Sequence, residues 1–262
     1  MKVTNIASGS KGNITFVEAN STKILVDIGI SLSRVEKALK ELGSSAEKID
    51  AVLITHEHSD HIGGLECFAK KYPHVHIYTN KLVWKEVSSR CPTVAGKQEV
   101  HFFEYDTMFS VGEFSCCAME NYHDSKSCAS FIISCGGGKL GICTDLGMIT
   151  EHQIDMLSQC KVVYLECNHD KKMLAECAYP AILKKRISGK NGHLSNDQCA
   201  TSAAKLALGQ TKVIVLSHIS ENSNTPELAY SRVADELEMA NIKNTILLLA
   251  YQNKIGKTIT IN

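Results

Sequence analysis

The sequence predicts an α/β fold in which two mixed β-sheets lie face to face with helices on their outer surfaces. Short apolar runs typical of strands alternate with helical patterns at both ends of the chain, and a series of strand-like runs joins the two ends. No low-complexity linker or charge block divides the 262 residues. We therefore expect a single domain over residues 1–262.

The first three predicted strands cover residues 3–6, 13–18 and 23–27. The loop at 7–13 between the first two is rich in residues that tolerate tight turns. Its backbone N–H groups could bind an anion, but it lacks a Walker pattern. A β-hairpin turn is therefore the simpler interpretation of this loop.

The next segments alternate between helix and strand. Leu32, Val35, Leu39 and Leu42 recur at helical spacing, and Gly43 predicts the end of that helix. The apolar run 51–54 predicts a buried strand, followed by a turn and then a helix that begins at about residue 62. The alternation continues with a strand at 76–79 and a helix at about 80–90.

The middle of the chain reads as a strand meander, and helices return after residue 145. The expected strands of the meander cover 101–103, 114–120, 129–135 and 139–144. The later helices are expected at about 150–159, 170–176, 196–208 and 226–240, and the later strands at 162–165, 213–216 and 246–249. The glycines at 136–138 predict a hairpin turn.

The overall charge excludes a global attraction to nucleic acid or membrane, because 28 basic residues balance 28 acidic ones. Any anionic substrate must therefore meet a local basic patch. The N-terminus lacks an apolar signal segment and no run is long enough to span a membrane, so we expect a cytoplasmic protein without membrane contact. Eleven cysteines without a CxxC pair indicate reduced, mostly buried thiols.

The clearest chemical signal is the segment 55–64, which follows the apolar run 51–54 and contains His56, His58, Asp60 and His61. On an extended chain His56 and His58 point the same way, so they can reach one ion. Asp60 and His61 follow at the turn and can face a second ion. Imidazole and carboxylate suit zinc, iron or manganese, and paired ions in hydrolytic sites lie roughly 3.5–4 Å apart.

Further candidate ligands stand at the ends of apolar runs: His123, Asp145 and His218. Taken singly, an aspartate at such a place is often a turn former and a histidine a satisfied polar group. The remaining strand or turn histidines are interpreted as surface or packing residues: His74, His76 and His101.

The pattern HxHxDH after an apolar strand resembles the signature of the metallo-β-lactamase superfamily, whose members share a four-layer αββα sandwich. Histidine at position 58, where diiron members carry glutamate, favours the hydrolytic members. The resemblance implies two metal groups joined by a bridging Asp145. One group would be His56, His58 and His123, and the other Asp60, His61 and His218. The resemblance also implies that Asp27, which ends a predicted strand, supports the metal loop without binding metal itself.

The chemistry that this resemblance implies uses two divalent ions of zinc, manganese or iron. A hydroxide shared by two such ions forms near neutral pH, and the same ions stabilise the oxygen that gains negative charge. Asp60 is expected to orient that hydroxide as well as to bind metal. Its loss should therefore reduce the rate and the metal content together.

The substrate class is indicated by the third ligand and the C-terminal half. The segment 121–126 lacks the PGHS-like motif of small-molecule members. The segments 192–196 and 216–220 are similar to those of ribonuclease Z, which implies that His193 assists the scissile phosphate or the leaving oxygen. No insertion of the size of a β-CASP domain separates Asp145 from His218.

A closer resemblance, to the YycJ (WalJ) family of bacterial proteins, extends over nearly the whole chain. The segments that carry it are 7–13, 55–61, 144–147, 166–170, 185–187, 192–196 and 217–220. It implies a metal-dependent exonuclease acting 5′ to 3′ on duplex DNA. Cys167 stands where serine is expected in the ESNHD motif of that family.

The same resemblance raises accessory candidates near the site. Asn168 and His169 could contact substrate, and His169 could alternatively be an accessory ligand or a structural residue. Lys185 and Arg186, with further lysines at 171, 172, 184 and 190, form a local basic patch that could hold backbone phosphates. The alternative is a solvated helix face.

Three hypotheses follow from these observations. The first is a metal-dependent phosphodiesterase on nucleic acid, most simply a 5′-to-3′ DNA exonuclease, whose activity should fall steeply with salt. The second is a hydrolase of a small ester, thioester or lactam, with a closed apolar pocket. The third is a metal-stabilised binding protein without turnover. The sequence leaves open the metal, DNA against RNA, and the oligomeric state.

Overall fold

Two β-sheets pack face to face in the computed structural model, which describes residues 1–96 and 98–262. In the described part of the chain each sheet has seven strands. In spatial order the first sheet consists of β14 (Ile259–Thr260), β1 (Lys2–Ala7), β2 (Ile14–Ala19), β3 (Thr22–Val26), β4 (Ala51–Leu53), β5 (His76–Thr79) and β6 (Val100–Phe102). The second consists of β13 (Ile246–Leu249), β12 (Val213–Ser217), β11 (Val162–Glu166), β10 (Gly138–Cys143), β9 (Ala129–Cys135), β8 (Phe114–Glu120) and β7 (Met108–Val111).

Both sheets are mixed, as the sequence predicts. In the first sheet β1, β2 and β3 pair antiparallel and β3 to β6 pair parallel. In the second, β7 to β10 are antiparallel and β10 to β13 are parallel. The antiparallel β1–β2 pair confirms the hairpin interpretation of the loop at 7–13.

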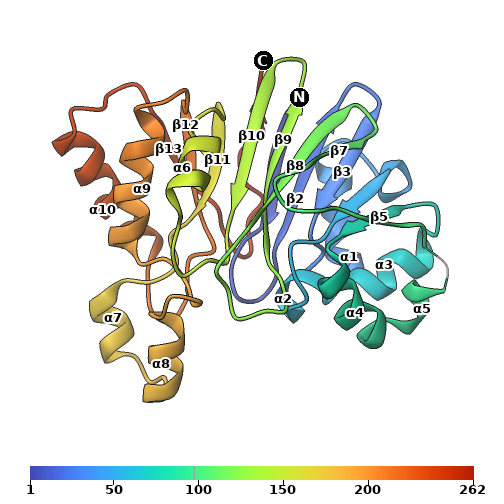
Figure 1. Ribbon diagram of the computed structural model, residues 1–262, viewed down its shortest axis with the longest axis horizontal. Helices are drawn as coiled ribbons and strands as arrows, with labels where there is room; N and C mark the ends of the chain where they lie inside the picture. Colours follow the sequence, from blue (N-terminus) through green and yellow to red (C-terminus); the bar gives the residue numbers. More distant parts are fainter. Residues whose placement is uncertain (97) are drawn as a thin grey trace.

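Helices cover the outer face of each sheet (Figure 1). Beside the first sheet lie α1 (Leu32–Glu41), α3 (Leu65–Lys71), α4 (Lys81–Arg90), α5 (Pro92–Ala95) and the short 3₁₀ turn η1 (Ala46–Lys48). Beside the second lie α6 (Glu151–Leu157), α9 (Asn196–Ala207) and α10 (Pro226–Met239). Two short helices, α7 (Lys171–Glu176) and α8 (Ala181–Ile187), project beyond the sheets next to α9, as Figure 1 shows.

Three buried apolar clusters match these layers. One joins Leu25 and Val52 of the first sheet to Leu39 and Phe68 of its helices. A second, which includes Phe131, lies between the sheets, and a third lies under α6, α9 and α10. The fold is therefore the four-layer αββα sandwich that the sequence predicts, with each apolar strand face covered by a helix or by the other sheet.

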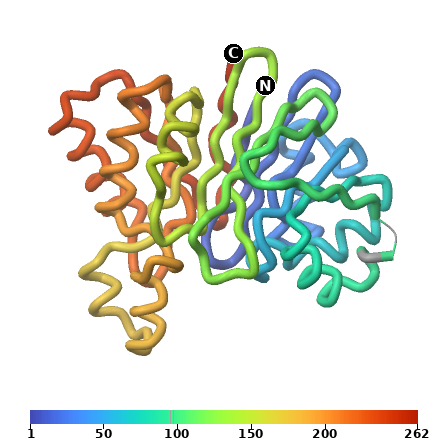
Figure 2. The backbone as a smooth tube through the Cα atoms, viewed as in Figure 1, coloured from blue at the N-terminus to red at the C-terminus, as the bar shows by residue number. Residues whose placement is uncertain are grey.

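The two ends of the chain lie side by side, as Figure 2 shows, because β14 pairs with β1 and the N-terminal amine donates to the carbonyl of Ile261 at 2.9 Å. The last residues thus close the edge of the first sheet.

Most predicted elements are present with ends shifted by a few residues. The main correction concerns Asp60 and His61, which lie inside a short helix, α2 (Ser59–Ile62), where the sequence predicts a turn. The backbone N–H groups of His61 and Ile62 donate to the carbonyl of His58, so the helical turn forms directly after the extended segment. Elements that were not predicted are η1, β7, α5, α8 and β14.

Two chemical expectations can be compared directly with the structure. All eleven cysteines in the described chain are free, and eight of them are buried, which confirms that the thiols are mostly buried. None of the described helices is long and apolar enough to cross a membrane.

Candidate metal centre

The candidate ligands meet where the carboxyl ends of strands from both sheets come together. The motif at 55–61 follows β4, whose strand is parallel to its neighbours β3 and β5. His123 follows β8, Asp145 follows β10 and His218 follows β12. Parallel strands present their carboxyl ends at one edge, which explains how residues far apart in sequence reach one site.

The first ligand group is His56, His58 and His123, whose ligand atoms lie within 4.8 Å of one another. His58 Nδ1 and His123 Nε2 are 3.3 Å apart. The ring centroids of the three histidines are separated by 4.6 to 5.0 Å. This spacing suits three imidazoles around one ion.

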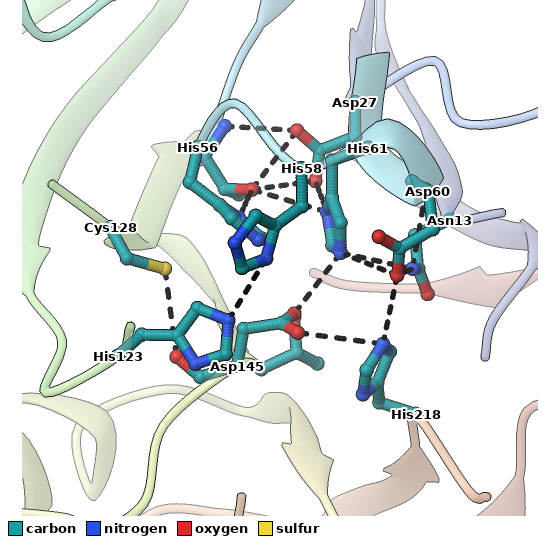
Figure 3. Close-up of polar contacts among 12 residues, drawn as sticks. Asn13, Asp27, His56, His58, Asp60, His61, His123, Cys128, Asp145 and His218 are labelled. Atoms are coloured by element: carbon teal, nitrogen blue, oxygen red, sulfur yellow. Dashed lines mark hydrogen bonds and ion pairs between the residues drawn. The ribbon is translucent and has the colours of Figure 1, made fainter. Parts of the chain in front are cut away.

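The second group is Asp60, His61 and His218. Asp60 Oδ2 lies 3.5 Å from Nε2 of His61 and also 3.5 Å from Nε2 of His218. Asp145 lies between the two groups, with Oδ2 at 3.3 Å from His61 and Oδ1 at 3.4 Å from His218 (Figure 3). Asp145 also forms a possible ligand group with His56 and His61, so its carboxylate faces both groups.

The histidine rings are held by hydrogen bonds on the nitrogen that faces away from the centre. Nδ1 of His61 lies 2.8 Å from Asp27, that of His123 lies 3.1 Å from the carbonyl of Gly192, and that of His218 lies 3.1 Å from Glu166. Carboxylate and carbonyl oxygens only accept, so each of these Nδ1 atoms donates a proton and leaves Nε2 for the centre. Metal-binding histidines are oriented in this way.

Two buried atoms at the centre support the fit to metal. Nε2 of His56 and Oδ2 of Asp145 make no hydrogen bond to any described residue. A buried polar atom without a partner costs about 1–3 kcal/mol, and coordination would remove that cost. Asn13 Nδ2 lies 3.0 Å from His61 Nε2 and would lose this contact if His61 bound an ion. The same amide also donates to Asp60 and to the Gly9 carbonyl, and these two hydrogen bonds can remain when the ion is bound.

Three residues of the centre adopt left-handed backbone conformations. The φ angles of Asp27, Asp145 and His218 are 61°, 64° and 55°. Such a conformation costs roughly 1–3 kcal/mol for a non-glycine residue, and such costs concentrate at functional sites. Each of the three directly follows a strand or lies one residue beyond it, where the turn aims the side chain into the space between the sheets.

The electrostatics of the centre are dominated by buried carboxylates facing histidines. Burial lowers the pKa of His56 well below its usual value. Burial also opposes protonation of His218, but Asp145, Asp60 and Glu166 outweigh it and raise the pKa of His218 to about 10. The carboxylates therefore create a strongly negative site that favours a bound cation.

Glu166 is a candidate functional residue that the prediction from sequence missed. This fully buried side chain contacts Nδ1 of His193 at 2.8 Å and Nδ1 of His218 at 3.1 Å. It also accepts from the backbone N–H groups of Leu146 and Leu194, each at 3.1 Å. The signal that could have found it is a charged residue closing an apolar strand, the same signal that marks Asp145.

The hairpin loop at 7–13 forms hydrogen bonds with the backbone of two residues of the centre. Ser8 Oγ accepts from the backbone N–H of His218 at 2.7 Å, and the carbonyl of Asp60 accepts from the N–H of Asn13 at 2.7 Å. Gly29 packs so closely that an added Cβ would lie 1.7 Å from the Asp60 carbonyl oxygen. Only glycine fits there, because the chain at 28–30 runs directly against α2.

His193 lies beside the ligand groups, as expected. Its ring centroid is 5.1 Å from that of His123 and 5.2 Å from that of His218, and 18% of its side chain is exposed. With Nδ1 held by Glu166, the nitrogen left for a ligand is Nε2.

The accessory candidates differ in burial: two are buried beside the centre and two are exposed on α8. Asn168 is buried and donates to the carbonyl of His218 at 2.9 Å, so it supports that strand end. His169 is buried, its Nδ1 has no hydrogen-bond partner among the described residues, and burial lowers its pKa to about 4. Lys185 and Arg186 are exposed on α8, and Arg186 forms an ion pair with Asp124, which is adjacent to His123.

The fold and the site together define a metallo-β-lactamase-fold hydrolase with a cluster of histidines and aspartates able to bind metal ions. The chain belongs to the β-lactamase superfamily, because the family model described as "Beta-lactamase superfamily domain" matches residues 22–219. A solved structure of the metallo-beta-lactamase fold protein YhfI from Bacillus subtilis aligns over 97% of this chain and 98% of its own, with a TM-score of 0.70 and 17% identity. That structure supports the fold alone.

Within the superfamily the chain belongs to the family of WalJ and YycJ. It is 31% identical to the exodeoxyribonuclease WalJ of Streptococcus pneumoniae over 92% of this chain and 90% of that protein. It is also 31% identical to the exodeoxyribonuclease YycJ of Bacillus anthracis over 89% of this chain and 88% of that protein. The predicted family is thereby confirmed.

Proposed function

We propose that this protein is a metal-dependent DNA exonuclease that removes nucleotides from the 5′ end of duplex DNA. The observation that carries the proposal is the set of three imidazoles, His61, His123 and His218, whose Nδ1 atoms are held by protein acceptors. Their Nε2 atoms face the other candidate ligands: those of His61 and His218 face Asp145, and that of His123 faces His58. Relatives named exodeoxyribonucleases, matched over nearly their whole length, support DNA as the substrate.

In this proposal two divalent ions occupy the two groups. His56, His58 and His123 would hold one ion, Asp60, His61 and His218 would hold the other, and the carboxylate of Asp145 faces both groups. Bound there, ions such as zinc or manganese would supply a nucleophile from water near neutral pH and positive charge for the phosphate. Imidazole and carboxylate ligands suit both metals, so the choice depends on geometry and supply.

The chain's own residues then divide the remaining work. Asp60, with 21% side-chain exposure, is the ligand carboxylate most open to solvent and can accept the proton of the attacking water. His193 Nε2 can hold a proton at the leaving oxygen, because Glu166 fixes Nδ1. The 18% exposure of the His193 side chain leaves it within reach of a substrate that approaches from solvent.

Direct evidence would come from digestion of duplex DNA labelled at either the 5′ or the 3′ end, using protein loaded with manganese or zinc. We expect early release of labelled mononucleotide from the 5′-labelled end only. Early release of label from the 3′-labelled end would indicate the opposite direction of digestion, from 3′ to 5′. If metal-loaded protein cleaves neither DNA nor RNA, the proposal fails and a small ester, thioester or lactam becomes the better substrate.

Substitution Lys185→Ala should weaken binding of DNA without changing the chemistry of the centre. Lys185 is exposed on α8, so loss of one phosphate contact should reduce the slope of log affinity against log salt by about 1. Arg186 gives a less clear test, because Asp124 already neutralises part of its charge. The measurement is DNA affinity over a salt series.

The matched control for Lys185→Ala is Lys37→Ala, an exposed lysine on α1 outside the first sheet. Hydrolysis of bis(p-nitrophenyl) phosphate, a small phosphodiester that needs no extended contact, should be equal in both variants and in the wild type. If Lys185→Ala leaves the slope of log affinity against log salt unchanged, Lys185 on α8 is not part of the DNA-binding surface.

A further inference from the structure

Two histidines and a glutamate gather at the outer edge of the first sheet, away from the metal centre. β5 pairs parallel with β6, and Tyr78 lies opposite His101. Because side chains alternate along a strand, His76 and Tyr78 share one face with Glu99 and His101. Tyr78 packs against the cluster between the sheets, so this face is the inner one.

The three polar groups converge on one point. His76 Nδ1 and His101 Nε2 are 2.9 Å apart. The carboxylate of Glu99 lies 3.3 Å from His101 Nε2 through Oε1 and 3.8 Å from His76 Nδ1 through Oε2. Sequence reasoning treats His76 and His101 as isolated surface or packing residues, because 25 residues separate them in the chain.

We propose that His76, Glu99 and His101 form a zinc site, separate from the metal centre, that ties β5 to the edge strand β6. Zinc binds imidazole and carboxylate at roughly 2.0–2.2 Å, which places the ligand atoms of a tetrahedral ion roughly 3.4 Å apart. The separations of 2.9, 3.3 and 3.8 Å bracket that value. Two histidines and one glutamate leave the fourth position to water.

The two imidazole rings face each other across the proposed site. The rings of His76 and His101 are within 7° of parallel with centroids 5.2 Å apart, and a hydrogen bond between the two facing nitrogens requires a proton on one of them. Zinc would replace that proton once each ring turns its lone pair toward the carboxylate. The side chains are 42% and 36% exposed, which gives both rings room to turn.

The location separates this site from the metal centre. His76 lies opposite Ala51 at the start of the parallel strand β4, while the metal motif begins at Thr55 beyond the end of that strand. Four residues of extended chain correspond to roughly 13 Å. The ring of Tyr78 stacks on His101 at 4.5 Å between centroids and fixes one side of the site.

The test compares zinc content in the wild type, His76→Ala/His101→Ala and the matched control His74→Ala. His74 is a nearby exposed histidine that contacts the carbonyl of Glu47. After equilibration with micromolar zinc and gel filtration, elemental analysis should find one zinc fewer per chain in the double variant and an unchanged count in the control. The difference does not depend on how many ions the metal centre holds.

The exposed Glu99 gives a second variant that leaves both rings in place. Glu99→Gln should weaken zinc binding at this site by at least about 10-fold, measured by competition with a chelating dye. After loading with cobalt, the wild type should show stronger visible absorption per chain than the double variant, because the double variant lacks this site. Equal zinc counts in the wild type and the double variant, or a difference seen only at millimolar zinc, would overturn the proposal.

Discussion

Substitution Asp60→Asn is expected to reduce DNA cleavage by roughly 10²- to 10⁴-fold and to lower metal content in the same preparation. Asparagine keeps the shape of the side chain but removes the negative charge that lies 3.5 Å from both His61 and His218. The two losses should appear together, because the proposed roles of Asp60 in metal binding and in proton transfer use the same carboxylate. Single-turnover cleavage and elemental analysis measure them.

The matched control for Asp60→Asn is Asp155→Asn, an exposed aspartate on α6. It should retain wild-type rate and metal content. Thermal unfolding of the three proteins separates folding defects from chemistry, because a variant that remains folded at the assay temperature but does not cleave DNA has lost chemistry and not structure. An Asp60→Asn enzyme with a rate within 10-fold of wild type would exclude the role proposed for this carboxylate.

The metal motif could be predicted because its chemistry is local. His56, His58, Asp60 and His61 lie within six residues, and the strand before them is marked by an uninterrupted apolar run. The same logic found His123, Asp145 and His218, which each follow an apolar strand. Their division into two groups came from resemblance, and the structure brings together the atoms that this division requires.

The supporting residues could not be predicted, because their partners are distant in sequence. Ser8 contacts the backbone of His218, 210 residues away, and Asn13 contacts Asp60, 47 residues away. Neither residue carries a local signal beyond that of a turn former. The sequence of one strand does not indicate which atoms of the other sheet will lie opposite it.

Two of the unpredicted elements, β14 and α8, share a physical cause. β14 has two residues and α8 is a short helix without a buried residue, so neither has the apolar periodicity on which sequence reasoning depends. α8 is held instead by its connection to the site, where the carbonyl of Gly192 contacts His123 and Arg186 pairs with Asp124. Pairing with β1 likewise defines β14.

Substitution Glu166→Gln is expected to reduce DNA cleavage by roughly 10- to 100-fold and to destabilise the fold by about 1–3 kcal/mol. The carboxylate accepts four hydrogen bonds: two from the rings of His193 and His218 and two from the backbone. Burial raises the pKa of Glu166, but His193 and His218 outweigh it and lower the pKa to about 2, so the side chain is ionised. A glutamine amide would turn an N–H group toward N–H donors.

Glu57→Gln is the matched control, because Glu57 is also buried near the centre but accepts from the backbone N–H of Lys126 and contacts neither ring. It should keep nearly full activity and metal affinity. The measurements are zinc affinity, cleavage rate and urea unfolding for both variants. Equal behaviour of the two would mean that Glu166 acts only as a buried acceptor. Loss confined to Glu166→Gln would show that orientation of His193 and His218 limits the reaction.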